Sequence, residues 1–261
     1  MISIRIIPLL LLTLLAAGSS ELAAQEDKPG ATNLFITYRC RPADRPAFIR
    51  ALREDGTKLF DQYRRDGVIK EYLLLYNELT DALTWDALVI LTFERYENTE
   101  RWRAIELERP GGLTPPLLAL GAPHTSYFAD RVIAAGTAGD RASSIFTVIP
   151  YNYSAKAEYM NYIRTYGVPQ FDGWIREGAI STYAIYLNHH ATGEPWDALL
   201  LFEYNGIAGL AARDIVKQRV RAELVKDPGW KLLSDAKHDY RVEREVVMAR
   251  ALVGEKVVGG R

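Results

Sequence analysis

The chain has 261 residues, a formal net charge of −1, and 48% hydrophobic and 25% charged side chains. Such a composition is too apolar for a disordered chain, and the balanced charge gives no basic excess that would attract a nucleic acid or an anionic lipid surface. The single cysteine, Cys40, cannot form an intrachain disulfide, so a buried core must stabilise the fold.

Residues 1–24 have the pattern of a cleavable secretory signal peptide. Arg5 is the only early charge, an apolar run extends from Ile6 to Ala17, and small or polar residues lead to Ala24. The run is shorter than the roughly 20 residues that span a bilayer, although an uncleaved anchor is the alternative. No cysteine lies near the cleavage position. We therefore expect a periplasmic or secreted protein that is not a lipoprotein and has no integral membrane segment after signal removal.

In the first unit, residues 33–135, the sequence predicts strands that alternate with helices. A β-branched and aromatic run predicts the first strand, and apolar residues at three- and four-residue spacing predict the helix that ends at Asp66-Gly67. The expected order is a strand at 34–38, a helix from Pro42 or Asp44, strands at 68–76 and 85–93, a helix at 95–109, a short helical piece at 116–120 and a strand at 127–134.

A Gly, Ala and Thr linker at 136–142 leads to a second unit, residues 143–253, with the same order of elements. Pro169 should kink the first helix of this unit, whereas Lys58 at the matching point of the first unit should not. The expected order is a strand at 145–149, a helix at 154–174, strands at 179–187 and 196–204, a helix at 207–226, a turn at 227–229 and a strand at 240–252. Residues 254–261 are expected to form a flexible tail.

One four-residue sequence occurs twice, as Trp85-Asp86-Ala87-Leu88 and as Trp196-Asp197-Ala198-Leu199, at an offset of 111. The same offset pairs further residues without a gap from about residue 34 to residue 94. Repetition at a fixed spacing predicts two copies of one unit. Past residue 95 the offset grows, so the second long helix and its following turn carry the extra residues.

Strand, helix, strand, strand, helix, strand, occurring twice, resembles a tandem member of the dimeric α/β-barrel superfamily of ferredoxin-like domains. The predicted fold class is α+β, with two tandem ferredoxin-like β-α-β-β-α-β repeats that form a dimeric-α/β-barrel-like pseudo-dimer. The resemblance implies two four-stranded sheets that enclose a pocket and carry helices outside. Members include cofactor-independent monooxygenases of polycyclic phenols, isomerases, haem enzymes of the chlorite dismutase and dye-decolourising peroxidase type, and proteins with no known activity. No family motif transfers residue by residue, and neither histidine segment matches a proximal haem-ligand motif.

Five aromatic residues are candidates for ligand binding. Tyr72 and Tyr183 occupy equivalent points in the second strands, Tyr186 follows in the second unit only, and Trp85 and Trp196 open the third strands. A tyrosine can stack on an aromatic ligand while its hydroxyl orients or protonates that ligand. Packing in the core is the alternative for all five, because these residues also suit a half-buried strand.

Four residues are candidates for catalysis. Asp86 and Asp197 could act as general bases at the mouth of the barrel, and His124 and His238 precede the fourth strands at matching places. The alternatives are a hydrogen bond from each carboxylate to the backbone of its hairpin and a shared structural hydrogen bond for the imidazoles.

No metal site is expected, because His189-His190 and the nearby Glu194 lack the spacing of a zinc site. Phosphate loops, nucleophile elbows and Cys-x-x-Cys pairs are absent from the sequence. We predict an exported small-molecule-binding barrel with a largely apolar lumen, either a binding protein or a cofactor-independent oxygenase or isomerase of an aromatic or apolar substrate. The alternatives are a scaffold protein whose barrel is filled by its own side chains and, third, a haem-binding protein. No cofactor is expected outside that third alternative, and the chain is expected to be a monomer or a homodimer.

Overall fold

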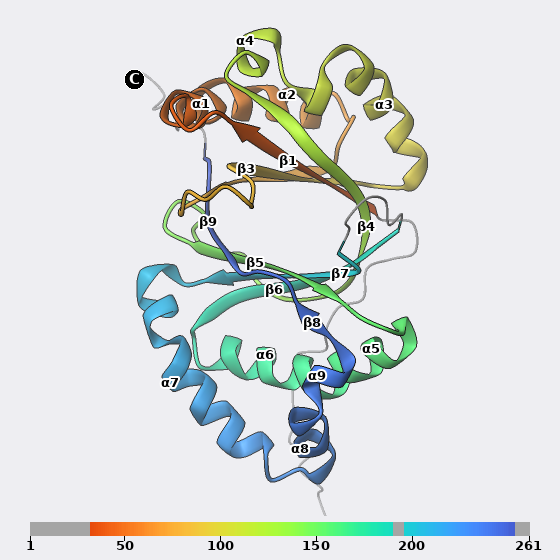
Figure 1. Ribbon diagram of the computed structural model, residues 1–261, viewed down its shortest axis with the longest axis vertical. Coiled ribbons are helices and arrows are strands. Elements are labelled where there is room, and N and C mark those ends of the chain that lie inside the picture. Colours follow the sequence, from red (N-terminus) through yellow and green to blue (C-terminus); the bar gives the residue numbers. More distant parts are fainter. Residues whose placement is uncertain (1–31, 190–195, 254–261) are drawn as a thin grey trace, which may run out of the picture.

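The computed structural model describes residues 32–189 and 196–253. Two antiparallel layers face each other in a closed barrel, with the helices of the first half over one outer face and those of the second half over the opposite face (Figure 1). The predicted signal peptide, the tail and most of the loop with His190 and Glu194 lie outside the described residues. Within the described ranges, no helix is both long and apolar enough to cross a membrane.

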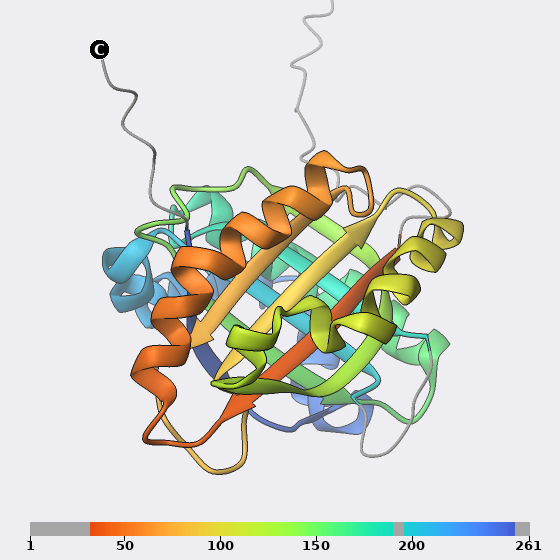
Figure 2. The ribbon, with the colours of Figure 1, turned by 90° about the horizontal axis from the view of Figure 1, so that it is seen from above.

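The first half follows the predicted order of elements. Its strands are β1 (Thr32–Cys40), β2 (Glu71–Asn77), β3 (Ala87–Phe93) and β4 (Gly121–Gly136), and its helices are α1 (Arg45–Ala51), α2 (Thr57–Arg65), α3 (Thr99–Glu108) and α4 (Pro115–Leu118). Short 3₁₀ turns lie at Tyr96–Asn98 and Pro110–Gly112. Seen from above, the helices of this half cover the strands beneath them, and α1 and α2 run in nearly the same direction as those strands (Figure 2).

The second half repeats this order, but it has two short helices before its last strands where the first half has one. Its strands are β5 (Ile145–Asn152), β6 (Ile180–Asn188), β7 (Ala198–Tyr204), β8 (Val242–Glu243) and β9 (Val247–Ala251), and its helices are α5 (Lys156–Tyr162), α6 (Val168–Arg176), α7 (Gly206–Leu224), α8 (Pro228–Asp235) and α9 (Lys237–Tyr240).

Two seams join the halves and close the barrel. Strand β4 pairs with β1 over its first part and with β6 from Ala129 to Gly136, and β2 pairs with β9. The order of neighbours is β7-β6-β4-β1-β3-β2-β9-β5, and β5 returns to β7. Each of these eight strands therefore has a neighbour on both sides around the ring, and closure leaves no long unpaired edge.

Side chains from all eight barrel strands form a lumen cluster that fills the middle of the barrel. Phe35 lies edge-on to Tyr186 and Trp196, with ring centroids 4.9 Å and 5.3 Å apart. The outward side chains of the same strands form two other apolar clusters beneath the helices. Because both faces of the central strands are covered, every residue of β3 and of β7 is buried.

Both halves interrupt their first long helix at the same point. A π-helical turn at Leu52–Gly56 separates α1 from α2, and its counterpart at Ile163–Gly167 separates α5 from α6. The expectation that only the second half breaks there, through Pro169, is wrong. Pro169 lies in the first turn of α6, where a missing N–H is tolerated, and so cannot be the cause of an interruption that both halves share.

Two helices that were not predicted lie between the predicted turn at 227–229 and the predicted strand at 240–252, and that strand is divided into two. Asp227 caps α8 by accepting hydrogen bonds from the backbone N–H groups of Gly229 at 2.8 Å and Trp230 at 3.3 Å. Pro228 at the first helical position suits this start. Helix α9 and the short strand β8 follow, so that the barrel strand β9 begins only at Val247.

Candidate functional site

A cavity of about 390 Å³ lies between the outer face of the second-half sheet and the helices that cover it. We call it the outer pocket. Its volume is in the range of small-molecule sites. The residues that line it are Ile149, Tyr151, Tyr162, Ile163, Tyr166, Gly167, Gln170, Phe171, Trp174, Leu200, Phe202, Tyr204, Lys217, Arg221, Lys237, His238, Arg241 and Glu243.

The corresponding space in the first half is filled by side chains. Trp102 of α3 is buried and lies edge-on to Tyr63, the counterpart of Trp174, with ring centroids 5.6 Å apart. A Cβ atom on Gly112 would clash with the Trp102 ring, so the turn after α3 closes directly onto the indole. Helix α3 has 10 residues and α7 has 19, and α7 contributes Lys217 and Arg221 to the lining of the second-half space.

Stacked aromatic rings form one side of the outer pocket. Tyr162 stacks on Tyr166 and on Tyr240, in each case with centroids 5.0 Å apart, and Tyr166 stacks on Trp230 at the same distance. The Trp230 indole N–H donates to the backbone carbonyl of Tyr166 at 3.0 Å. Both faces of the Tyr162 and Tyr166 rings are therefore covered by other rings, so these two side chains are fixed and an aromatic ligand would meet their edges.

Arg241 lies at the mouth of the outer pocket and is held mainly by tyrosines. Its guanidinium carbon is 4.2 Å from the centroid of the Tyr151 ring, and its Nε donates to the Tyr162 hydroxyl at 3.1 Å. The Glu243 carboxylate, 3.5 Å from Nη1, is its ion-pair partner. Burial lowers the pKa of Arg241, but the neighbouring phenols Tyr151 and Tyr162 outweigh that effect and raise it, so this residue stays cationic.

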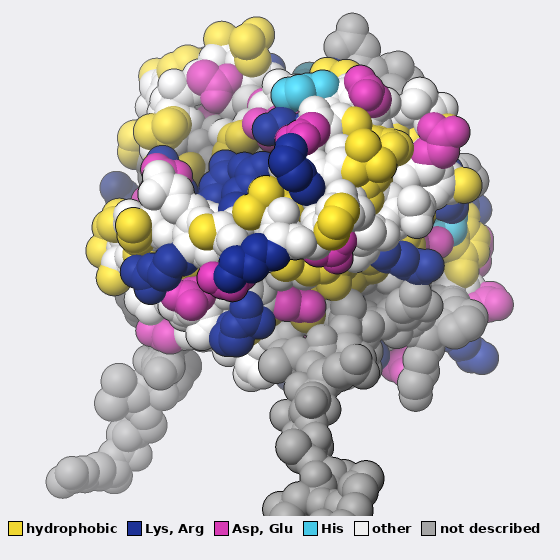
Figure 3. Space-filling model, turned by 90° about the horizontal axis from the view of Figure 1, so that it is seen from below, with side chains coloured by type: hydrophobic (Ala, Val, Ile, Leu, Met, Phe, Trp, Pro, Cys, Tyr) yellow, Lys and Arg dark blue, Asp and Glu magenta, His cyan; other side chains and the backbone are white. Residues whose placement is uncertain are grey.

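Three further cations border the pocket. Arg221 donates to the Tyr166 hydroxyl at 3.2 Å and to Ser234 Oγ at 2.9 Å, and it has no carboxylate among these partners. Burial, and then the Arg221 charge, lower the pKa of Lys217, and Lys237 acts in the same direction. On the face covered by α7, α8 and α9, Lys and Arg side chains gather near the middle (Figure 3). The positive charge of this mouth exceeds its negative charge.

Two polar atoms of the pocket wall are buried and have no hydrogen-bond partner among the described residues. They are Oε1 of Gln170, an acceptor, and Nε1 of Trp174, a donor. A buried polar group without a partner is costly and calls for a specific explanation, such as a ligand or a bound water. Both atoms belong to α6, which forms one side of the cavity.

The two equivalent tyrosines of the second strands point toward the helices. The Tyr72 ring lies 5.5 Å from Phe60 and its hydroxyl donates to the Thr57 carbonyl at 3.2 Å. The Tyr183 hydroxyl donates to Asp172 Oδ1 at 2.8 Å. Burial is the main cause that raises the pKa of Tyr72 to about 12 and the pKa of Tyr183 still further. Both hydroxyls therefore stay protonated near neutral pH, and both have partners within the chain.

The other three aromatic candidates lie inside the barrel. Tyr186, Trp85 and Trp196 belong to the lumen cluster and are buried. Trp196 also contacts Tyr127, with centroids 5.7 Å apart. The structure thus separates the predicted ligand-binding set into an inward group and an outward group, and it brings none of the five to the outer pocket.

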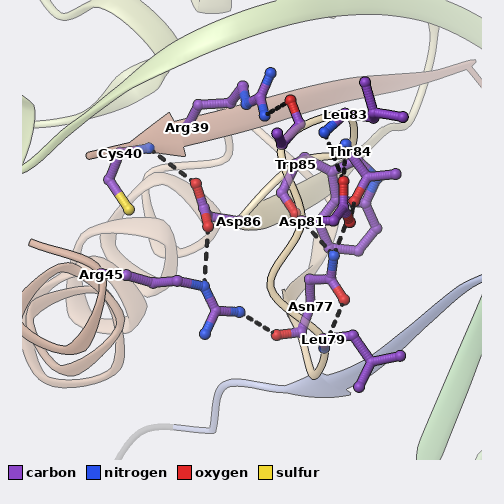
Figure 4. A network of polar contacts seen from close by, with 11 residues as sticks. Arg39, Cys40, Arg45, Asn77, Leu79, Asp81, Leu83, Thr84, Trp85 and Asp86 are labelled. Atoms are coloured by element: carbon purple, nitrogen blue, oxygen red, sulfur yellow. Dashed lines mark hydrogen bonds and ion pairs between the residues drawn. The ribbon is translucent and has the colours of Figure 1, made fainter. Parts of the chain in front are cut away.

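Asp86 and Asp197 each fasten the start of a third strand to the end of a first strand. Asp86 accepts hydrogen bonds from the Cys40 backbone N–H at 3.0 Å and from Arg45 Nε at 2.9 Å (Figure 4). Asp197 accepts from the Tyr153 backbone N–H and from Asn152 Nδ2, both at 3.0 Å. These bonds reach another strand instead of the hairpin next to each carboxylate, and they leave both carboxylates satisfied within the chain.

The two histidine candidates are exposed and lie in different environments. His124 is at the bulge of β4 opposite β1, and His238 is on α9 at the rim of the outer pocket. Among residues 32–189 and 196–253, no group of three or more His, Cys, Asp or Glu side chains could hold a metal ion. His189 forms an ion-pair contact of 2.5 Å with Asp130 when it is protonated.

Haem would need an axial donor in the pocket wall. In the outer pocket the only imidazole among the described residues is that of His238, which is exposed at the rim, while the deeper donors are tyrosine hydroxyls, Gln170 and an indole. The tyrosine hydroxyls nearest the mouth are already bonded to arginines. This donor set does not fit a histidine-ligated haem.

Sequence reasoning did not identify the outer pocket, although two signals for it are present. Residues 151–166 contain five tyrosines, whereas the positions 111 earlier contain none. The extra residues of the second long helix and of the segment after it form α7, α8 and α9, and these helices carry the cations of the pocket mouth. Asymmetry between two otherwise matching units was therefore the informative feature.

Comparisons with known proteins support the fold alone. No family model matches the sequence, and no curated protein matches it. A crystal structure of an anthrone oxidase-like protein is 11% identical, covers 86% of this chain and 92% of its own, and has a TM-score of 0.55. A candidate monooxygenase from Lactobacillus acidophilus is 12% identical, with coverages of 86% and 95% and a TM-score of 0.54. A haem-binding protein from Thermus thermophilus is 10% identical, with coverages of 85% and 91% and a TM-score of 0.47. The chain has the fold of the dimeric α/β-barrel superfamily, with both sheets supplied by one polypeptide.

Proposed function

We propose that this protein binds a flat aromatic molecule with an acidic group, and that the outer pocket is the binding site. The observation that carries the proposal is the combination of stacked aromatic walls with a mouth that holds four cations, Lys217, Arg221, Lys237 and Arg241, and one carboxylate, Glu243. A similar fold in an anthrone oxidase-like protein is compatible with an aromatic ligand.

The acidic group of the ligand would lie between Arg241 and Arg221. Both guanidinium groups are fixed by tyrosines, so they lose little conformational freedom when an anion binds. Guanidinium groups in this arrangement suit a carboxylate or a phenolate, with which they form charge-assisted hydrogen bonds. The ring system of the ligand would extend toward α6, where Gln170 and Trp174 have the unpartnered polar atoms.

A matched pair of ligands tests this proposal. We expect 2-naphthoate to bind the mature protein at least about tenfold more tightly than the neutral 2-naphthamide, because a hydrogen bond to a charged group contributes about 1.5–3 kcal/mol. Arg241→Met should reduce this difference, and it should weaken 2-naphthoate binding more than 2-naphthamide binding, because three other cations remain at the mouth. Lys231→Met, which removes an exposed cation of α8 paired with Asp235, is the control. Tryptophan fluorescence and calorimetry would report both affinities.

Equal affinity for the two ligands, or an unchanged preference in Arg241→Met, would refute the proposed site. Haemin provides a further arm of the experiment. A Soret shift that is lost in His238→Ala would contradict the proposal in favour of the haem alternative, whereas 2-naphthoate binding without such a shift would support it.

Proton transfer to Lys217 is a second candidate function of the same pocket. The pKa of this amine is lowered by burial and by Arg221, so it is closer to neutrality than an ordinary lysine. A neutral Lys217 could accept the proton of a bound phenol, and the resulting phenolate would be stabilised by the arginines. Spectra of bound 2-naphthol should then show the naphtholate at a lower pH than in water, and Lys217→Met should reduce this shift while the part due to the arginines remains.

A further inference from the structure

A second cavity, of about 1380 Å³, opens at one end of the barrel, and we call it the barrel mouth. It lies where β2 and β6 begin and where β3, β4 and β7 end, so both halves line it. None of its lining residues belongs to the outer pocket. Its volume exceeds the usual range for a single small ligand, which leaves room for a long molecule.

The floor of the barrel mouth is apolar. It consists of the part of the lumen cluster that lines this cavity, and the hydroxyl of Tyr186 is its one polar group; the side chains are Leu73, Ile90, Ala134, Phe146, Ala184, Tyr186 and Leu201. Leu73 is partly exposed, whereas Ala184 is buried and has a small side chain. A hydrocarbon group placed on this floor would be removed from water at about 25 cal/mol per Å² of buried apolar surface.

The rim of the barrel mouth is charged and carries more cations than anions. Five cations border it, whereas only two rim carboxylates, Glu71 and Glu94, oppose them. The cations are Arg64, Lys70, Arg95, Arg131 and Arg141. Among the described residues, no carboxylate lies within ion-pair distance of Lys70 or Arg95, while Arg131 is 3.7 Å from Glu71.

A third carboxylate, that of Glu203, is buried and fixes the linker beside the mouth. It accepts hydrogen bonds from Ser144 Oγ at 2.7 Å, from the Gly139 backbone N–H at 3.1 Å and from Thr182 Oγ1 at 3.3 Å. These bonds hold both ends of the segment that carries Arg141, whose guanidinium donates to the Tyr72 carbonyl at 3.4 Å. The rim cation of the linker is therefore placed by the fold.

We infer that the barrel mouth binds an amphiphilic anion, with its acidic head group at the rim and its alkyl chain on the floor. The separation of charge and apolar surface within one cavity carries this inference, because a fully polar anion would leave the floor without a complementary partner. A carboxylate head group and a phosphate head group present the same chemistry to Lys70 and Arg141. This site is separate from the outer pocket and does not depend on the function proposed for that pocket.

Decanoate, decanol and butyrate below micellar concentrations test the site by calorimetry. We expect decanoate to bind at least about tenfold more tightly than either decanol or butyrate, since each lacks one of the two required groups. The double variant Lys70→Met/Arg141→Met should lose this advantage over decanol, while 2-naphthoate binding in the outer pocket stays unchanged. Lys58→Met, an exposed cation on α2 paired with Asp55, is the matched control.

A second variant blocks the floor. Ala184→Phe should abolish decanoate binding while circular dichroism and 2-naphthoate binding report an intact fold, and if it fails to fold, the double variant remains the test. Decyl phosphate tests whether the preferred head group is a phosphate or a carboxylate. Binding of either decanoate or decyl phosphate that is tighter than that of decanol supports the inference. Decanoate that binds no better than decanol, or that keeps its affinity in the double variant, would overturn it.

Discussion

At the scale of single residues, Tyr183 is a candidate ligand-binding residue whose hydroxyl forms a hydrogen bond with Asp172 within the fold. The hydroxyl is buried against α6, 2.8 Å from its acceptor, while the carboxylate is only half-buried. Asp172→Ala should destabilise the protein most, by about 1–3 kcal/mol, because it leaves a buried hydroxyl unpaired. Tyr183→Phe should cost about 1 kcal/mol, and Asp172→Asn, which keeps an acceptor oxygen, should cost least. Urea denaturation would measure this order, and the reverse order would contradict the assigned bond.

Lys217 should couple ligand binding to proton uptake. Because its folded pKa lies below the ordinary lysine value, the unfolded state binds more protons in the window between the two values, and stability rises with pH across that window. An anion in the outer pocket should raise the pKa again. Within that window, 2-naphthoate binding should therefore take up protons. Calorimetry in buffers of different ionisation enthalpy would detect this uptake, and its persistence in Lys217→Met would assign it elsewhere.

At the scale of elements, α6 and α7 both line the outer pocket, and they contact each other beside it. A Cβ atom on Gly173 would lie 2.5 Å from Val220 Cγ1, so the two helices approach closely there. Gly173→Ala should destabilise the protein by about 1–3 kcal/mol through overpacking and weaken 2-naphthoate binding by moving α7. Val220→Ala in the same chain should restore much of both losses. A double-mutant cycle measures this coupling, and strictly additive effects would show that the contact does not limit the pocket.

The sequence predicted the elements well where one local rule decided the outcome. Alternation, helical spacing and the glycine after Asp66 located most strands and helices, since each is a short-range signal. The helix that begins at Pro228 was not predicted, because Asp227-Pro228-Gly229 can form either a turn or a capped helix start. The packing around Trp230 decides between these two structures. The outer pocket was missed for a related reason. Its residues come from segments that are distant in the sequence. The reason for the opening is seen only when the second half is compared with the first half, where Trp102 fills the corresponding space.

At the scale of the whole molecule, each half depends on the other to cover its inner face. Phe35, Leu88 and Ile90 of the first half pack in the lumen against side chains of the second half, and β2 and β4 pair across the seams. Residues 32–140 expressed alone should therefore self-associate through the same face, because the apolar surface and the two strand edges are otherwise exposed. Native mass spectrometry would reveal dimers or larger species. A stable, folded monomer of this fragment would show that the halves are independent.

The closed ring of strands also bears on where a chain with this fold can begin and end. The linker joins the end of β4 to the start of β5, and β6 and β7 lie between these two strands in the ring. In the same way, β2 and β3 lie between β9 and β1, so the end of β9 is three strand spacings from the start of β1. Three strand spacings amount to roughly 14 Å, which a few residues can bridge. A circular permutant that opens within the linker and joins Val253 to Thr32 through several inserted residues would exchange the order of the halves while it preserves every strand pair. The order in which the two halves are synthesised is then a property that can be changed separately from the architecture.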